Sequence, residues 1–177
     1  MFIDLARKRR SVRRYEPRPI EPEKIDRLIE AAIRAPSSRG LRPWEFIVVS
    51  DPQTIEQLAA AKPHGSSFLK GAALAVVVCA DPAKCDVWVE DAAIAAIYVH
   101  LAATDMDLGS CWIQIRERKH DSARSAAAYV GELLHLPPQL EVEAIVAVGY
   151  PAEEKKPHAA DTLPYDKVHY EKYGRQA

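Results

Sequence analysis

The stretch DVWVEDAAIAAIYVHLAATDMD, residues 86–107, decides how this chain folds. It holds no glycine or proline, and its alanine, isoleucine, valine and leucine residues fall on every side of a helix instead of along one stripe. A helix that is apolar nearly all round is buried on all sides. We therefore predict a long internal helix here, ended by Gly109 and packed against other helices across a subunit interface.

Shorter apolar runs flank this helix and predict the other elements. Two runs rich in β-branched residues each stop at an Asp-Pro pair, which is typical of strands. Another segment begins at Pro22, carries apolar residues at the spacing of an amphipathic helix, and ends at Ala35-Pro36. A shorter helix is predicted at 123–134. The predicted strands are 46–49, 75–80, 111–113 and 142–148.

The order of these elements predicts an α+β fold in one domain that spans residues 1–177. The connections vary in length and the long helix is too apolar for a single covering layer, which disfavours a simple parallel α/β sheet. We expect a mixed β-sheet with helices on both faces. Residues 152–177 become polar and proline-interrupted and then aromatic again, which predicts a C-terminal tail that wraps a neighbouring surface.

Composition disfavours several classes of protein. The chain has 24 Lys and Arg against 25 Asp and Glu, a net charge of −1, so we expect no nucleic-acid partner. The first residues lack the order of a signal peptide and no run approaches the ~20 apolar residues of a membrane span, which favours a cytoplasmic protein with no membrane partner. Three cysteines without a C-x-x-C pair and six histidines without ligand spacing predict reduced thiols and no metal site.

Three polar segments could carry chemistry. The first, Arg9-Arg10-Ser11-Val12-Arg13-Arg14-Tyr15, follows an opening helix and could bind a phosphate, or it could be a solvated basic turn at the helix C-terminus. The second, APSSRGLRPW at 35–44, could present hydroxyls and backbone donors to a planar ring, or could be a plain helix-to-strand turn. The third, residues 108–115, leads the long helix back into the sheet. Its Cys111 is predicted to pack rather than to act as a nucleophile, because no basic partner is visible nearby.

Together these segments resemble the nitroreductase family of oxidoreductases, which depend on flavin mononucleotide (FMN). The family pattern is Arg-Arg-Ser-x-Arg-x-aromatic, then Ala-Pro-Ser-Ser-x-Asn-x-Gln-Pro-Trp-x-Phe, then Gly leading to Cys-Trp-Ile after a long helix, then Gly-Tyr-Pro before a tail. The chain shows these motifs in order at 9–15, 35–46, 109–113 and 149–151. It departs from the pattern at Gly40, where the family usually has Asn, and at Arg42, where it usually has Gln.

The resemblance implies an intertwined homodimer in which both subunits line each of two FMN sites. The residues that it assigns to the FMN phosphate are Arg9, Arg10, Ser11, Arg13 and, in a looser match, Lys155 or Lys156. The residues that it assigns to the flavin ring are Trp112, Ile113 and Gln114 of one subunit and Pro36, Ser37, Ser38 and Gly40 of the other. A backbone N–H at or beside Gln114 would face the flavin N5 atom. Arg42 would bind an acidic substrate or the pyrimidine edge of the flavin, or else it would point to solvent or pair with Glu45.

The function that this resemblance implies is transfer of a hydride from NADH or NADPH, by way of flavin N5, to a small planar acceptor such as a nitroaromatic or a quinone. The cofactor carries the chemistry, so no catalytic side chain is expected. The lack of a G-x-G-x-x-G loop argues against a Rossmann dehydrogenase. The alternative is a non-catalytic module that binds a flavin, another phosphorylated ligand or nucleic acid through its basic N-terminal segment.

Overall fold

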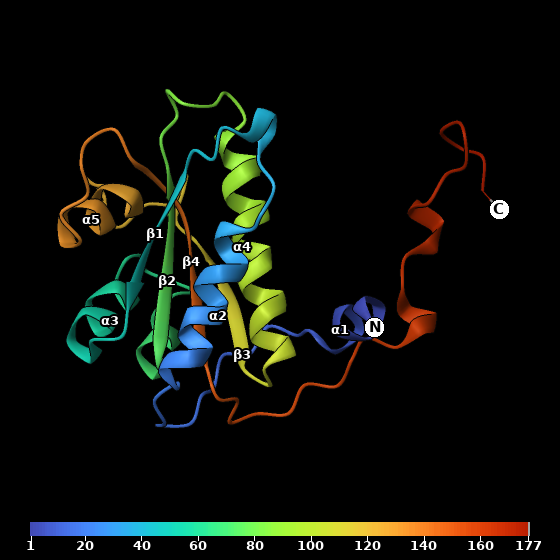
Figure 1. Ribbon diagram of the computed structural model, residues 1–177, viewed down its shortest axis with the longest axis horizontal. Helices are drawn as coiled ribbons and strands as arrows, with labels where there is room; N and C mark the ends of the chain where they lie inside the picture. The colour runs from blue at the N-terminus through green and yellow to red at the C-terminus, as the bar shows by residue number, and fades with distance from the viewer. Residues whose placement is uncertain (177) are drawn as a thin grey trace.

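A four-stranded sheet forms the centre of the protein, with its strands in the order β1-β2-β4-β3 (Figure 1). The computed structural model describes residues 1–176. The strands are β1 (Trp44–Val49), β2 (Leu74–Ala80), β3 (Gly109–Gln114) and β4 (Glu141–Gly149). The four predicted strands are therefore confirmed, and each extends slightly further at one end or both.

All neighbouring strands of the sheet pair antiparallel, so the sheet has less parallel pairing than we expected. A parallel contact lies at the outer edge of β3, where Ser11 forms an isolated bridge with Ser110. The central strands β2 and β4 are buried on both faces, which explains their unbroken runs of Val, Ile and Ala. The predicted α+β class, with helices on both faces of a sheet, is confirmed.

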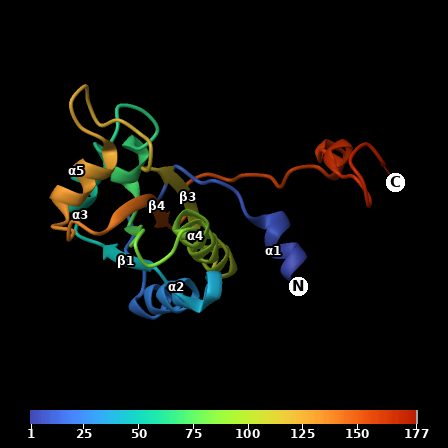
Figure 2. The same cartoon turned by 90° about the horizontal axis from the view of Figure 1, so that it is seen from above.

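Helices cover both faces of this sheet (Figure 2). Within residues 1–176 the α-helices are α1 (Phe2–Lys8), α2 (Pro22–Ile33), α3 (Pro52–Ala59), α4 (Trp88–Asp105) and α5 (Ala126–Leu133). The short 3₁₀ turns are η1 (Ser38–Gly40), η2 (Ser67–Gly71), η3 (Ala160–Thr162) and η4 (Tyr165–Lys167). Helices α2 and α4 pack on one face of the sheet, and α3 and α5 pack on the other. None of the helices in the described residues is long and apolar enough to cross a membrane.

Helix α4 confirms the predicted long apolar helix, but it does not end at Gly109. Asp107 takes the left-handed conformation that follows the helix, with φ of 59°. Gly109 is instead the first residue of β3, and a Cβ at this position would lie 2.8 Å from Val12 Cγ1. The glycine is therefore needed for the close approach of the N-terminal segment. On the outer side of α4, Ile94 and Ile97 stay 37% and 40% exposed.

The N-terminal segment crosses the ends of β3 and β4 and is fixed there by Tyr15. The Tyr15 hydroxyl donates to the Val12 carbonyl at 2.6 Å, and its ring packs so closely on Gly149 that a Cβ there would lie 2.8 Å from Tyr15 Cδ1. Burial raises the pKa of Tyr15, which keeps the phenol protonated as the donor. This arrangement determines where the basic residues on either side of Val12 lie.

Two arms leave the core on the same side of the molecule (Figures 1 and 2). One is helix α1, and the other is the C-terminal segment from residue 152 to residue 176. Both arms carry large apolar side chains that remain exposed, namely Met1, Phe2, Ile3, Leu163, Tyr165, Val168, Tyr170 and Tyr173. Large apolar patches on a protein surface typically mark an interface with another molecule.

Candidate functional site

The first and third predicted segments meet at the outer edge of β3. Val12 donates its N–H to the Ser110 carbonyl at 3.0 Å, next to the parallel bridge between Ser11 and Ser110. Segment 9–13 therefore meets the start of the edge strand at Ser110, although about a hundred residues separate the two in the sequence. The sequence predicted both segments as site residues, and the fold brings them together.

The edge position of β3 directs some of its backbone donors away from the sheet. In an antiparallel strand, alternate residues turn their N–H and C=O groups to opposite sides. Ile115 donates its N–H inward, to the Glu143 carbonyl of β4 at 3.1 Å, whereas the Ser110 carbonyl faces outward to Val12. Gln114 follows the alternation of Ser110, so its N–H points out of the sheet edge. This is the orientation that a backbone donor to a bound flavin needs.

The side chain of Gln114 is occupied by other parts of the protein. Its amide oxygen accepts from Trp112 Nε1 at 3.0 Å, and its amide nitrogen donates to the Arg116 carbonyl at 3.1 Å and to Glu143 Oε1 at 3.3 Å. Burial raises the pKa of Glu143, whose side chain lies on the inner side of this network. Gln114 is thus rigidly held, and it can reach a ligand with its backbone rather than with its amide.

A buried histidine on α4, His100, contacts the edge strand β3 at Ser110. His100 of α4 is 3% exposed, and its Nδ1 lies 2.7 Å from Ser110 Oγ. Burial, with a smaller contribution from Arg9, lowers the pKa of His100 to about 4, so the imidazole is neutral at pH 7. Because the imidazole is neutral, it adds no positive charge next to the basic segment 9–13. Its contact with Ser110 Oγ also orients the Ser110 side chain, whose backbone lies beside Ser11.

Basic groups from both chain termini gather beside this edge. Arg10 donates to the Lys156 carbonyl, which brings the segment after the Gly-Tyr-Pro motif next to the N-terminal segment. A cavity of about 300 Å³ lies between them, lined among others by Lys8, Arg10, Gly109, Glu153 and Lys155. The predicted partners Arg10 and Lys156 are therefore neighbours. Lys155 adds its ammonium group beside Glu153, whereas the Arg13 guanidinium lies 5.7 Å from the centre of the Phe68 ring.

The chain already holds an anionic group at this segment. Glu153 Oε1 accepts the backbone N–H of Arg13 at 2.7 Å, and its other oxygen lies 3.2 Å from Lys155 Nζ. The Arg13 N–H and the Lys155 ammonium hold the pKa of Glu153 below its usual range. Backbone N–H and basic side chains are thus arranged to receive oxyanions, as a phosphate group requires. The donors present fit the phosphate of FMN.

Two further cations lie near the same strand, and the sequence analysis did not identify them. Lys62 is half-buried, and burial together with the neighbouring Arg118 lowers its pKa. The Cys111 side chain of β3 acts on this pKa in the opposite direction. Burial raises the pKa of the Cys111 thiol, which supports the prediction that this cysteine packs. Lys62 lies in an irregular turn with no motif around it, so no pattern in the sequence marks it as a site residue.

The second predicted segment, residues 36–42, lies elsewhere in the subunit. Its Ser38 N–H donates to Asp91 in the first turn of α4, at 2.8 Å. The cavity beside Arg10 is lined by Thr104, in the last turn of the same helix. At about 1.5 Å per residue these two points are about 20 Å apart along α4. One subunit therefore does not bring the two predicted halves of the site together.

Arg42 is exposed at the end of this segment. Its backbone N–H donates to Ser37 Oγ at 2.9 Å, and its φ is 47°. The Glu45 carboxylate lies 3.8 Å from Lys84 Nζ, and Arg42 forms no ion pair within residues 1–176. Its guanidinium is thus free to meet an anionic ligand.

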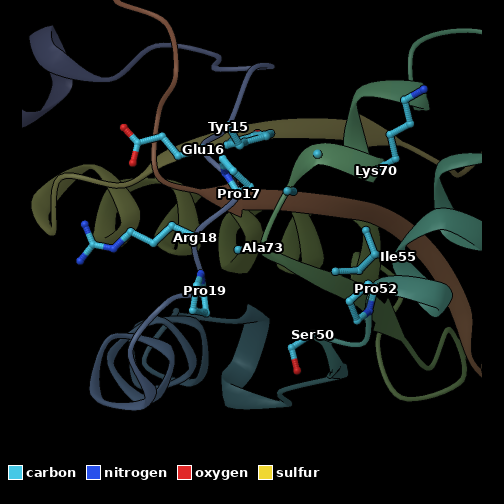
Figure 3. Close-up of a pocket in the computed structure, with 12 residues that line it drawn as sticks. Tyr15, Glu16, Pro17, Arg18, Pro19, Ser50, Pro52, Ile55, Lys70 and Ala73 are labelled. Carbon is cyan, nitrogen blue, oxygen red and sulfur yellow. The ribbon is translucent and has the colours of Figure 1, made fainter.

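A further cavity is separate from these residues. It has a volume of about 420 Å³ and lies between the 15–19 segment, the start of α3 and the residues after η2 (Figure 3). The charged groups of Glu16, Arg18 and Lys70 point away from it, and its wall includes Pro17, Ile55 and Ala73. It contains none of the predicted FMN residues.

Comparisons with known proteins find relatives of this chain in both sequence and fold. A model of the nitroreductase family matches residues 6–64 and 61–150. An Archaeoglobus fulgidus protein named as an NADH dehydrogenase/NAD(P)H nitroreductase is 37% identical over 172 residues, which cover 93% of this chain and 94% of that one. The structure of an FMN-dependent nitroreductase from Clostridium difficile R20291 superposes with a TM-score of 0.95 at 46% identity, over 97% of this chain and 99% of that chain. A nitroreductase from Desulfovibrio desulfuricans, solved in complex with FMN, has a TM-score of 0.72 at 27% identity, over 92% and 94% of the two chains.

Proposed function

Because this chain belongs to the nitroreductase family, we propose that it transfers a hydride from NADH or NADPH, by way of bound FMN, to a small planar acceptor such as a nitroaromatic or a quinone. When bound, FMN supplies the N5 atom that accepts and donates the hydride. The observations that carry the proposal are the outward N–H of Gln114 on the edge strand β3 and the basic segment 9–13, which meets the start of the same strand at Ser110. No side-chain acid and base pair is needed.

The residues of this edge have distinct parts in the proposal. The phosphate would be held by Arg9, Arg10, Ser11, Arg13 and Lys156. The ring would lie along Trp112, Ile113 and Gln114, with the Gln114 N–H directed at N5. Lys62 and Arg118 would add positive charge near this edge, which would favour a reduced cofactor that carries negative charge.

A second copy of the chain would complete each site. The 36–42 segment, with Pro36, Ser37, Ser38 and Gly40, lies about 20 Å along α4 from the phosphate residues. A two-fold axis that places two α4 helices against each other would bring this segment of one subunit to the β3 edge of the other. The exposed Ile94 and Ile97 on α4 and the apolar arms, including residues 152–176 of the tail, would be covered in such a homodimer.

An absorbance spectrum of the purified protein tests this function. We expect a yellow protein whose flavin band disappears when NADH or NADPH is added without oxygen, and returns when a nitroaromatic or a quinone follows. A colourless protein would refute FMN binding. A yellow protein whose band persists with both donors would support the alternative, a non-catalytic flavin-binding module. An Arg10→Ala/Arg13→Ala variant is the matched control, because it keeps the fold of β3 and removes two phosphate ligands.

A further inference from the structure

Asp91 is a buried acidic residue that no step of the proposed reaction uses. It lies in the first turn of α4 and is 3% exposed. Its Oδ1 accepts the Ser38 N–H at 2.8 Å, and its Oδ2 accepts from the Cys85 thiol at 3.3 Å. The adjacent cation, Arg39, forms its ion pair with Asp86 instead. A buried polar group is costly when it lacks a hydrogen-bond partner, so these two donors stabilise the Asp91 side chain in its buried position.

The segment that Asp91 contacts has a strained backbone. Arg39 and Arg42 have φ of 52° and 47°, in the left-handed region that residues with a Cβ rarely adopt, and Gly40 between them has φ of 67°. Such conformations persist only where neighbouring groups hold them. Inside the segment, Ser37 Oγ accepts the Arg42 N–H at 2.9 Å. The hydrogen bond from Ser38 to Asp91 is the buried link between this segment and α4.

We propose that Asp91 is a positioning residue, which holds the 37–42 segment in the shape that allows Ser37 and Ser38 to meet the flavin of the partner subunit. This rests on the proposed function and on the shared site. Asp91 does not touch the flavin, because its carboxylate is buried and both of its oxygens are engaged within its own subunit. Asp91 would therefore change FMN affinity only indirectly, by fixing the backbone conformation of residues 37–42.

Amide hydrogen exchange, measured on the full chain without FMN, tests whether Asp91 restrains the 37–42 segment. In Asp91→Ala the Ser38 amide should exchange at least about tenfold faster, because its buried acceptor is gone. In Asp91→Asn the side-chain oxygen remains, so the rate should stay within about threefold of the wild type. Glu90→Ala is the matched control, since Glu90 is an exposed acid in the same helical turn. It should leave the Ser38 rate unchanged.

Titration of the same proteins with FMN tests the consequence. We expect Asp91→Ala to weaken FMN binding about tenfold, and Asp91→Asn and Glu90→Ala to bind FMN as the wild type does. At saturating FMN, kcat should change less than the FMN Kd in Asp91→Ala. If Asp91→Ala fails to fold, Asp91→Leu replaces the buried charge by an apolar side chain of similar volume and takes its place.

Three results would overturn the proposal. The first is an unchanged Ser38 exchange rate in Asp91→Ala, and the second is faster exchange with an unchanged FMN Kd. The third is an equal loss of FMN affinity in Asp91→Asn, since a positioning role predicts rescue by the amide. If the wild type binds no FMN, the proposed function and the role of Asp91 toward FMN both fail. The exchange measurement still reports separately whether Asp91 holds the segment.

Discussion

Burial of His100 predicts a loss of stability in mild acid. The side chain is 3% exposed, and its pKa falls from 6.5 to about 4 in the folded protein. The unfolded chain binds a proton near pH 6.5, whereas the folded protein does so only near pH 4. Between these values the unfolded state holds more protons, so stability decreases as the pH falls. Above this window both states are neutral and His100 contributes no pH dependence.

The size of this effect follows from the shift in pKa. A difference of one pKa unit corresponds to about 1.4 kcal/mol, so the shift of His100 amounts to a loss of about 3 kcal/mol by pH 4. Other groups also titrate in this range. Glu21, Asp107 and Glu153 have lowered pKa values, so they lose stabilising interactions as the pH falls, while Glu143 has a raised one. A comparison with a variant at position 100 removes these shared contributions.

Chemical unfolding at fixed protein concentration, from about pH 8 to about pH 4, is the assay. His100→Gln cannot titrate, and it keeps a polar group near Ser110 Oγ. We expect the variant to be less stable at pH 8 because its side chain fits less well, and to lose about 3 kcal/mol less than the wild type on going to pH 4. If the two proteins lose stability in parallel over this range, the imidazole is not held neutral by burial and the reasoning is refuted.

Further outcomes test the phosphate residues, the packing at β3 and the role of Arg42. Charge-assisted hydrogen bonds contribute roughly 1.5–3 kcal/mol each, so Arg13→Ala should weaken FMN binding about tenfold or more, and an unchanged Kd in Arg10→Ala/Arg13→Ala would place the phosphate elsewhere. Gly109→Ala puts a Cβ 2.8 Å from Val12 Cγ1, so thermal unfolding should show lower stability and FMN titration a raised Kd. Arg42→Gln should lower kcat/KM for an anionic acceptor but not for a neutral acceptor of similar shape, and the difference should shrink at high salt. An unchanged ratio of the two kcat/KM values would show that Arg42 does not select the acceptor.

Most of the fold could be predicted because its signals are local. The β-branched runs and the unbroken apolar stretch 86–107 correspond to β1, β2 and α4. Helix α3 was missed because Asp51-Pro52 also ends a strand, and that pair was interpreted only in this sense. Two signals of a helix are nevertheless present in the sequence. Asp51 is a typical N-cap residue, and the apolar residues Ile55, Leu58 and Ala59 have helical spacing. The end of α4 was wrongly assigned to Gly109, because the sequence does not show that Val12 packs against this glycine.

The candidate site was predictable only in part, because it depends on contacts between distant residues. The motif residues of segments 9–13 and 109–114 could be named, but their meeting depends on the bridge between Ser11 and Ser110. Nothing in the sequence indicates that Asp91 accepts a hydrogen bond from Ser38, or that Glu153 accepts one from Arg13. Each of these pairs is far apart along the chain, and no spacing pattern links its members.

Native mass spectrometry of the purified protein tests the central claim, that two chains together form two FMN sites, most directly. It reports the number of chains and of FMN molecules in one intact species. We expect a species of two chains with two FMN, and in the Arg10→Ala/Arg13→Ala variant a species of two chains without FMN. A single chain that carries one FMN would contradict the shared site, and a species of two chains without FMN in the wild type would contradict the cofactor.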